Sequence, residues 1–186
     1  GVPFYLAGES MGGAVALASC TTTPTVTPVA KAPEPVGQPL PYRWTHGNAE
    51  KSRQAMIDTF KKAFLPTGEF VWTEKMPTEG EPKIIIDLLT QTAYAYQGDV
   101  LVGAASVSSA KTGKVTPLGF WKVLEKRKTY RSKKYNNAPM PFMQRIDEYG
   151  IALHGGVNPG YPASQGCVRM PMKFAEKLFG LTKLGT

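Results

Sequence analysis

A segment rich in proline and threonine, residues 21–41, limits what this chain can fold into. The segment contains six prolines and no aromatic residue. Proline fixes the backbone angle φ and removes a hydrogen-bond donor, so prolines at this density favour extended chain over helix or sheet. We therefore expect residues 21–41 to be a linker, and a folded domain to begin near Tyr42.

The residues before this linker, 1–20, allow two interpretations. Residues 17–20 read Leu-Ala-Ser-Cys and resemble a bacterial lipobox, in which Cys20 would receive a lipid ahead of a tether. Residues 8–12 read Gly-Glu-Ser-Met-Gly and match the G-x-S-x-G elbow of serine hydrolases, although the linker follows almost at once. We expect a signal remnant with lipidation at Cys20, and the lack of an initiator Met suggests a fragment.

Hydrophobic periodicity beyond the linker predicts a domain rich in strands. Asn48 can cap a helix over residues 49–64, which Pro66 and Gly68 would end. A second helix is expected over residues 168–179. The segments that predict strands are 83–89, 92–96, 100–107, 119–126 and 149–154. The expected fold class is therefore mostly β (α+β), with short flanking helices, and not a βαβ array.

The residues that could take part in catalysis lie close together in the sequence, between His154 and Arg169. His154 ends an expected strand, a loop rich in glycine and proline follows, and Cys167 is expected to open the last helix. A thiol attacks only as thiolate, so a neighbouring imidazole or a helix N-terminus must lower its pKa of about 8.5. From these residues alone, a buried free cysteine near a strand-end histidine is the plainer alternative.

The histidine and the cysteine each belong to a longer motif. His154 is followed by Gly155, and residues 164–169 read Ser-Gln-Gly-Cys-Val-Arg. This pattern resembles the signature of the L,D-transpeptidase catalytic domain, the YkuD type, and the resemblance extends over residues 83–186. Further segments that resemble the family are an opening hairpin and a TPxG element, at residues 84–88, 92–96 and 115–120.

The resemblance implies a domain organisation. Residues 83–186 would form a β-sandwich-like catalytic domain, and residues 42–82 a helical lead-in. The family usually continues past a Gly-Thr pair into a last strand, so we expect the C-terminal strand to be missing after Thr186.

The resemblance also implies roles for individual residues. Cys167 would be the acylated nucleophile, His154 its general base, and Gly155 the residue whose carbonyl orients the imidazole. The backbone N–H groups of Gly166 and Cys167 would stabilise the oxyanion, although simple turn geometry is the alternative for each glycine. The residues expected to anchor the loop or a substrate carboxylate are Arg169, Ser164 and Gln165.

The implied reaction is acyl transfer on peptidoglycan stem peptides. Cys167 would form a thioester, which an amine of a neighbouring stem or a lipoprotein would attack; with water instead, the protein would be a carboxypeptidase. Carbapenem β-lactams would acylate the same thiol, and no metal or other cofactor is implied. The family has a histidine at the position of Gln165, which cannot titrate near neutrality, so a weakened or dead peptidoglycan-binding module is the alternative.

Basic charge is local in this chain. The formal net charge is +8, and six of the basic residues lie within 126–134. A solvated loop, or attraction to the polyanionic cell wall, explains this run better than nucleic acid, because no reading motif accompanies it. No apolar run is long enough to span a bilayer, so a lipid on Cys20 would be the membrane link of a periplasmic, cell-envelope protein. Residues after the run could form a flap over the cysteine or pack in the core: Tyr130, Tyr135, Met140, Phe142 and Met143.

Overall fold

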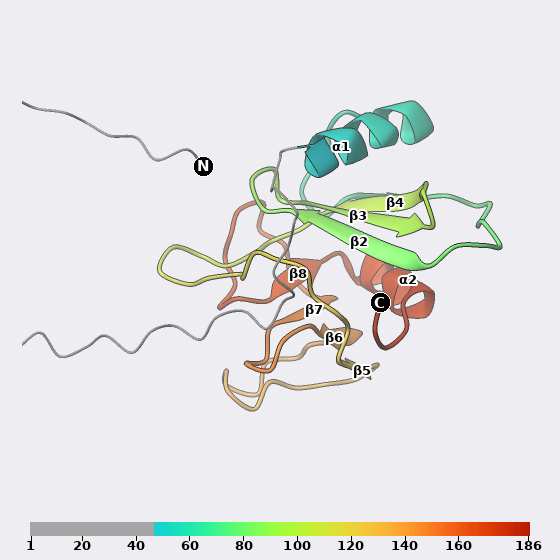
Figure 1. Cartoon of the computed structure of the whole chain (residues 1–186). Helices are drawn as coiled ribbons and strands as arrows, with labels where there is room; N and C mark the ends of the chain where they lie inside the picture. Colours follow the sequence, from blue (N-terminus) through green and yellow to red (C-terminus); the bar gives the residue numbers. More distant parts are fainter. Residues whose placement is uncertain (1–46) are drawn as a thin grey trace, which may run out of the picture. The chain divides into compact units, whose positions relative to one another are not determined.

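The computed structural model describes residues 47–186, which form two sheets and two helices (Figure 1). The predicted linker and the lipidation at Cys20 lie outside the described residues. None of the helices within 47–186 has the length and apolar character needed to cross a membrane. In chain order the elements are α1 (Gly47–Phe60), β1 (Phe70–Trp72), β2 (Pro82–Asp87), β3 (Thr92–Gln97), β4 (Val100–Ser106), β5 (Glu125–Arg127), β6 (Met143–Arg145), β7 (Ala152–Gly155), β8 (Val168–Met170) and α2 (Met172–Leu181).

The first sheet has the strand order β1-β4-β3-β2, and its neighbouring strands are antiparallel. The predicted meander over β2, β3 and β4 is confirmed. Gly98, with φ of +58°, begins the tight turn between β3 and β4, a conformation that glycine adopts without steric cost. Strand β1 was not predicted, because three residues are too few to show an alternating pattern.

Helix α1 covers one face of the first sheet (Figure 1). Met56 of the helix packs on Tyr94 and Tyr96 of β3, and the Tyr96 hydroxyl donates to Ser52 Oγ at 2.9 Å. The predicted helix is confirmed, but it ends at Phe60 because Lys61 adopts a left-handed φ of +55°.

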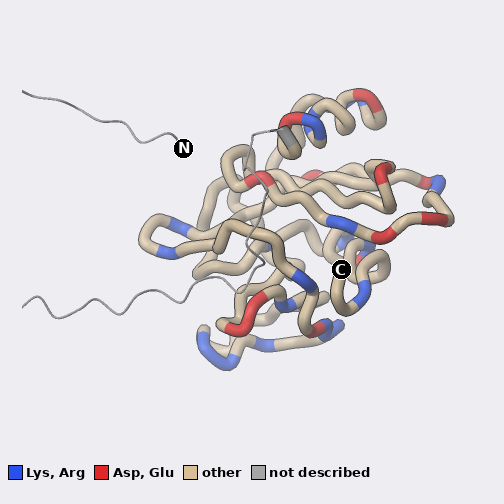
Figure 2. Tube along the Cα trace, in the orientation of Figure 1, with Lys and Arg blue, Asp and Glu red and all other residues tan. Residues whose placement is uncertain are grey.

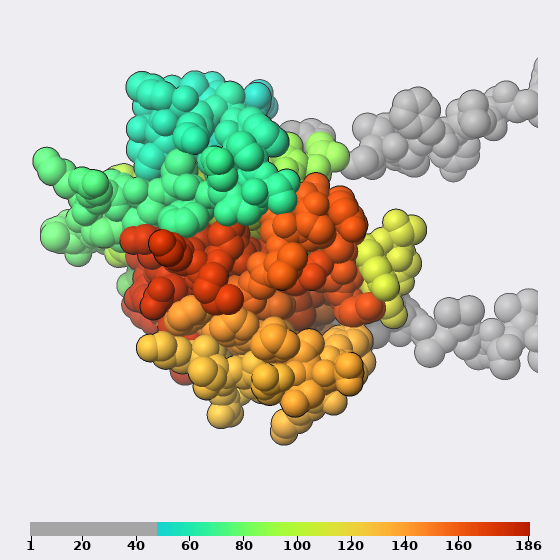
Figure 3. All heavy atoms as spheres, turned by 180° about the vertical axis from the view of Figure 1, so that it is seen from behind, coloured from blue at the N-terminus to red at the C-terminus, as the bar shows by residue number. Residues whose placement is uncertain are grey.

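The other face of the first sheet packs on α2 and on the second sheet. Phe174 of α2 is fully buried, and its ring lies 6.0 Å from Phe70 and 5.5 Å from Trp72. Leu153 of β7 and Val168 of β8 complete this central core from the second sheet. From behind, α1, the C-terminal residues and the segment around β5 and β6 form successive tiers (Figure 3). The expected sandwich-like, mostly β fold is confirmed.

The second sheet has the order β5-β6-β7-β8, and its β7–β8 pair is parallel. The predicted helix over 168–179 is wrong at its start, because residues 168–170 form β8 and Pro171 precedes α2. The predicted strand over 119–126 is confirmed only at its end, in β5. Gly119 has φ of +135°, which interrupts an extended strand there. The parallel pair is what builds the site.

Candidate active site

Strands β7 and β8 bring the predicted histidine and cysteine to the same face of the second sheet. Leu153 and Val168 are register partners that point into the central core. Successive side chains alternate, so His154 and its partner Arg169 face the other way. Cys167 lies two residues before Arg169 and therefore shares that face. The thiol-bearing residue packs there against Met140, Met143 and Ala152.

The His154 imidazole is held by the residue that follows it. Its Nδ1 lies 2.8 Å from the carbonyl oxygen of Gly155. A carbonyl only accepts, so this contact assigns the proton to Nδ1 and leaves the Nε2 lone pair as the basic atom. Burial lowers the pKa of His154, and the positive charge of Arg169 lowers it further, against the opposing effect of the Gly155 hydrogen bond. The imidazole is therefore neutral near pH 7.

The Cys167 thiol is also neutral at rest. Its Sγ lies 3.7 Å from the carbonyl oxygen of Gly150, which accepts the S–H. Burial raises the pKa of Cys167, as does the negative charge of Asp147, while the Ala152 amide and Arg169 lower it. Within residues 47–186 no hydrogen bond joins this thiol to His154.

The expected support from a helix N-terminus is absent from Cys167. The residue precedes β8 and not α2, so no helix dipole points at its sulfur. The sequence pattern placed the helix too early because apolar residues recur from β8 into α2, at Val168, Met170, Met172 and Phe174.

Ser164 fixes the backbone ahead of the cysteine. Its hydroxyl donates to the Cys167 carbonyl at 2.5 Å and accepts from the Gly166 N–H at 3.0 Å. The Gly166 N–H, expected in the oxyanion hole, is thus engaged within the loop in this conformation. Gln165 is half-buried and forms no hydrogen bond with any residue in 47–186, so Ser164, not Gln165, orients the loop.

Arg169 anchors the cysteine segment to the chain after β4. Its backbone exchanges hydrogen bonds with Ser108 at 2.8 and 3.0 Å, and its Nη2 donates to Ser108 Oγ at 3.3 Å. Its Nε is buried and has no partner in the described part of the chain. Of the two roles expected for Arg169, these contacts are those of a loop anchor.

Thr116 holds the same loop from a second direction. Its hydroxyl donates to the Gly166 carbonyl at 2.7 Å and accepts from the Ala110 N–H at 3.0 Å. Sequence reasoning assigned no role to Ser108 or Thr116. The TPxG element, which includes Thr116, was the signal that could have found one of them.

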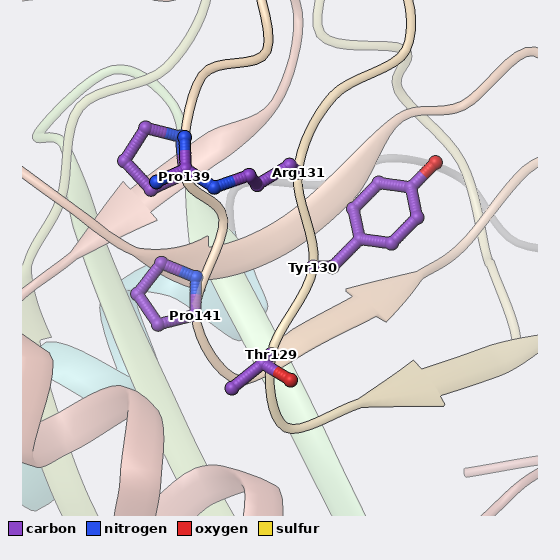
Figure 4. A pocket seen from close by; sticks show the side chains of 5 residues that line it. All are labelled: Thr129, Tyr130, Arg131, Pro139 and Pro141. Atoms are coloured by element: carbon purple, nitrogen blue, oxygen red, sulfur yellow. The ribbon is translucent and has the colours of Figure 1, made fainter.

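An open pocket adjoins the cysteine face. It has a volume of about 410 Å³ and lies between two facing segments of one loop (Figure 4). Tyr130 of this loop packs on the same methionine cluster as Cys167, and the Pro141 carbonyl accepts the Gly155 N–H at 2.8 Å. The lining residues are Thr129, Tyr130, Arg131, Pro139 and Pro141. Met140 and Met143 are buried and pack against Cys167. Of the two alternatives for these methionines, packing in the core therefore holds, and a flap over the cysteine does not.

The basic run that leads into this loop is not uniformly solvated. Lys126 Nζ donates to the carbonyl oxygens of Phe179 (2.7 Å) and Thr182, at the C-terminal end of α2. Burial lowers the pKa of Lys126. Arg127 pairs with Glu125 at 2.7 Å. Figure 2 shows the remaining basic residues of the run along the loop after β5. The run therefore combines a helix cap with an exposed basic loop.

Residues 47–186 contain no cluster of three or more His, Cys, Asp or Glu side chains arranged to hold a metal ion.

Comparison with known proteins places this site in a family. The L,D-transpeptidase catalytic domain (YkuD) matches residues 81–186. An L,D-transpeptidase from Stackebrandtia nassauensis is similar at 26% identity and a TM-score of 0.52, over 60% of this chain and 55% of that one. One from Xylanimonas cellulosilytica is similar at 25% identity and a TM-score of 0.53, over 72% of this chain and 66% of that one.

A third structure supports the fold alone. The LD transpeptidase LdtMt1 in complex with imipenem shares 15% identity, with a TM-score of 0.52, over 56% of each chain. The chain thus spans between about half and two thirds of these solved proteins. No curated protein matches it. Because the family match covers more than half of the chain and includes both His154 and Cys167, the chain belongs to the L,D-transpeptidase catalytic domain family.

Proposed function

We propose that this chain is a cysteine-dependent L,D-transpeptidase that transfers acyl groups between peptidoglycan stem peptides. One observation carries the proposal: Cys167 and His154 share the outer face of a parallel strand pair, with the Nε2 lone pair of His154 left basic. A thiol and a basic imidazole on one face are the parts that nucleophilic acyl transfer requires. Tyr130, which lines the pocket, packs on the same methionine cluster as Cys167.

The first half-reaction forms a thioester on Cys167. As the substrate carbonyl approaches, the thiol proton passes to His154 Nε2 while Sγ bonds to the carbonyl carbon. The Cys167 N–H is the amide left to stabilise the oxyanion, since that of Gly166 is engaged with Ser164. The tetrahedral intermediate collapses, and the departing D-residue amine takes the proton back from the imidazolium.

The second half-reaction releases the thioester. An acceptor amine gives a proton to His154 Nε2 and attacks the thioester carbonyl, and the Cys167 sulfur leaves as a thiolate that is reprotonated. Arg169 contributes here, because its positive charge favours the thiolate. The exposed basic loop would attract the carboxylates of a wall polymer toward the pocket.

The proposed substrate places the protein in the cell envelope. We propose a periplasmic location, with a lipid on Cys20 as the link to a membrane. Carbapenem β-lactams are the proposed inhibitors, and LdtMt1 was solved with one such compound, imipenem.

The decisive experiment is mass spectrometry of the purified chain incubated with imipenem. We expect one covalent adduct on the wild type and on Cys20→Ser, and none on Cys167→Ser. A hydroxyl cannot be ionised by an imidazole as a thiol can, because its pKa is much higher. No adduct on the wild type, or an adduct retained by Cys167→Ser, would contradict the cysteine mechanism.

A stem tetrapeptide then separates the acceptors. A crosslinked dimer in the presence of an acceptor amine indicates a transpeptidase, and a released tripeptide indicates a carboxypeptidase. Binding without either product indicates a peptidoglycan-binding module and overturns the proposal.

A further inference from the structure

Asp147 lies in the turn between β6 and β7 with its side chain only 5% exposed. Its Oδ1 accepts the N–H of Tyr149 at 3.0 Å and that of Ile151 at 2.7 Å. Within residues 47–186 no lysine, arginine or histidine pairs with this carboxylate. A buried charge is costly, and a neutral amide oxygen would accept the same two hydrogen bonds. The turn by itself does not require a negative charge.

The turn that Asp147 holds contacts the cysteine segment at two points. The Gly150 carbonyl oxygen lies 3.7 Å from Cys167 Sγ. The Ile151 side chain fills the space beside Gly166, where an added Cβ would lie 2.4 Å from Ile151 Cδ1. Asp147 therefore fixes the backbone of Ile151, which packs beside Gly166, and that of Tyr149, which precedes the Gly150 carbonyl next to the thiol.

Two charged side chains act electrostatically on this thiol, Asp147 from the turn and Arg169 from β8. His154 of β7 shares its face, and Tyr130 of the pocket loop packs on the same methionine cluster. Arg169 favours the thiolate, whereas Asp147 opposes it. Arg145 pairs with Glu125 through its Nε at 3.0 Å, and its Nη1 donates to the backbone carbonyl of Asp147 at 2.8 Å and not to the carboxylate.

We infer that Asp147 is a positioning residue that fixes the 148–151 turn against Cys167 and places a negative charge near the nucleophile. The inference rests on the proposed function of Cys167 as the nucleophile. A thiol kept protonated is slow to react with oxidants and adventitious electrophiles, because the thiolate is the reactive form. Burial is the larger cause of the raised pKa of Cys167, and the charge of Asp147 adds to it, so His154 is left to generate the thiolate during the reaction.

The test separates the charge of Asp147 from its hydrogen bonds. Asp147→Asn keeps the Oδ1 acceptor and removes the charge, whereas Asp147→Ala removes both. Glu148→Gln is the matched control, because Glu148 is the next residue of the same turn and is exposed. The rate of Cys167 alkylation by iodoacetamide is followed across pH 6–10 by peptide mass spectrometry, which resolves Cys167 from Cys20.

We expect Asp147→Asn to shift the alkylation profile to lower pH and to accelerate alkylation at pH 7. Each unit by which the thiol pKa falls gives about tenfold more thiolate, which is about threefold less nucleophilic, so the net gain is about threefold per unit. Glu148→Gln should leave the profile unchanged. Asp147→Ala should also lose acylation by imipenem, because the turn no longer holds the cysteine segment.

Two results would overturn the inference. One is an unchanged pH profile in folded Asp147→Asn; the other is an equal shift in Glu148→Gln. If Asp147→Asn does not fold, Asp147→Ser, whose hydroxyl can accept from the same amides, gives the same comparison. Alkylation reports on the thiol whether or not the chain acts on peptidoglycan, so a failure of the proposed function leaves this test intact.

Discussion

Replacing Gly166 by alanine measures how tightly the cysteine loop is packed. Gly166 has φ of +139°, a region that residues with a Cβ rarely adopt, at a cost of about 1–2 kcal/mol. The added Cβ would also lie 2.4 Å from Ile151 Cδ1 and 3.2 Å from the Val115 carbonyl oxygen. The isoleucine methyl can move at a cost of about 1 kcal/mol, whereas the backbone oxygen cannot easily retreat. We expect Gly166→Ala to lower the free energy of unfolding by about 3 kcal/mol.

The control is Gly113→Ala. Gly113 also has a positive φ, of +79°, but an added Cβ there meets nothing within 4 Å. This variant should cost only the backbone strain, about 1 kcal/mol. Ile151→Val removes the one methyl that the new Cβ would strike, so the double variant Gly166→Ala/Ile151→Val should recover about 1 kcal/mol relative to additive costs.

Urea denaturation of the purified chain gives the free energy of unfolding of each variant, provided that the slope of this free energy against urea concentration is the same as in the wild type. The packing argument fails if Gly166→Ala costs no more than Gly113→Ala. It also fails if the double variant shows no coupling.

Three further predictions follow from single contacts. Burial lowers the pKa of His154 below its ordinary value of 6.5, so the stability it contributes is complete above pH 6.5 and is lost as the pH falls through the folded-state pKa. Urea denaturation at pH 7 and pH 5 should show a larger loss for the wild type than for His154→Gln. Ser164→Ala breaks two loop hydrogen bonds and should lower the free energy of unfolding by about 1–3 kcal/mol, whereas Gln165→Ala should change it by less than about 0.5 kcal/mol. Lys126→Met uncaps α2 and should lower the thermal midpoint by several degrees, whereas Lys128→Met on the exposed loop should leave it nearly unchanged.

Local pattern predicted the first sheet well because each of its long strands carries its own signal. Strands β2, β3 and β4 are six or seven residues long, and a glycine turn separates the last two. Strand β8 has three residues and is followed by Pro171 and an apolar helix. Its pairing with β7 and the bridge from Arg169 to Ser108 make it a strand, and periodicity within a short window does not register partners so distant in the chain.

The same distinction holds for the site. A motif identified His154 and Cys167, but the charges and hydrogen bonds around them come from segments far apart in the sequence. Asp147 reaches the thiol through the β6–β7 turn, and Ser108 reaches Arg169 across 61 positions. The protonation state of the thiol depends on burial and on these neighbours, so a favourable helix dipole was inferred where none exists.

The parallel pairing of β7 with β8 fixes the relative positions of the reacting groups without using most of the loop that links the two strands. Hydrogen bonds between the strands, continued by that from the Gly156 N–H to the Met170 carbonyl oxygen, set the positions of His154 and the residues beside Cys167, and residues 157–163 of the connecting loop lie outside that register. The anchors at Ser108 and Ser164 close this loop at its far end. Insertions or exchanges within 157–163 can therefore reshape what approaches the thiol while the relative placement of the base His154 and the nucleophile Cys167 stays constant, which makes this loop the natural place to alter selectivity, by evolution or by engineering.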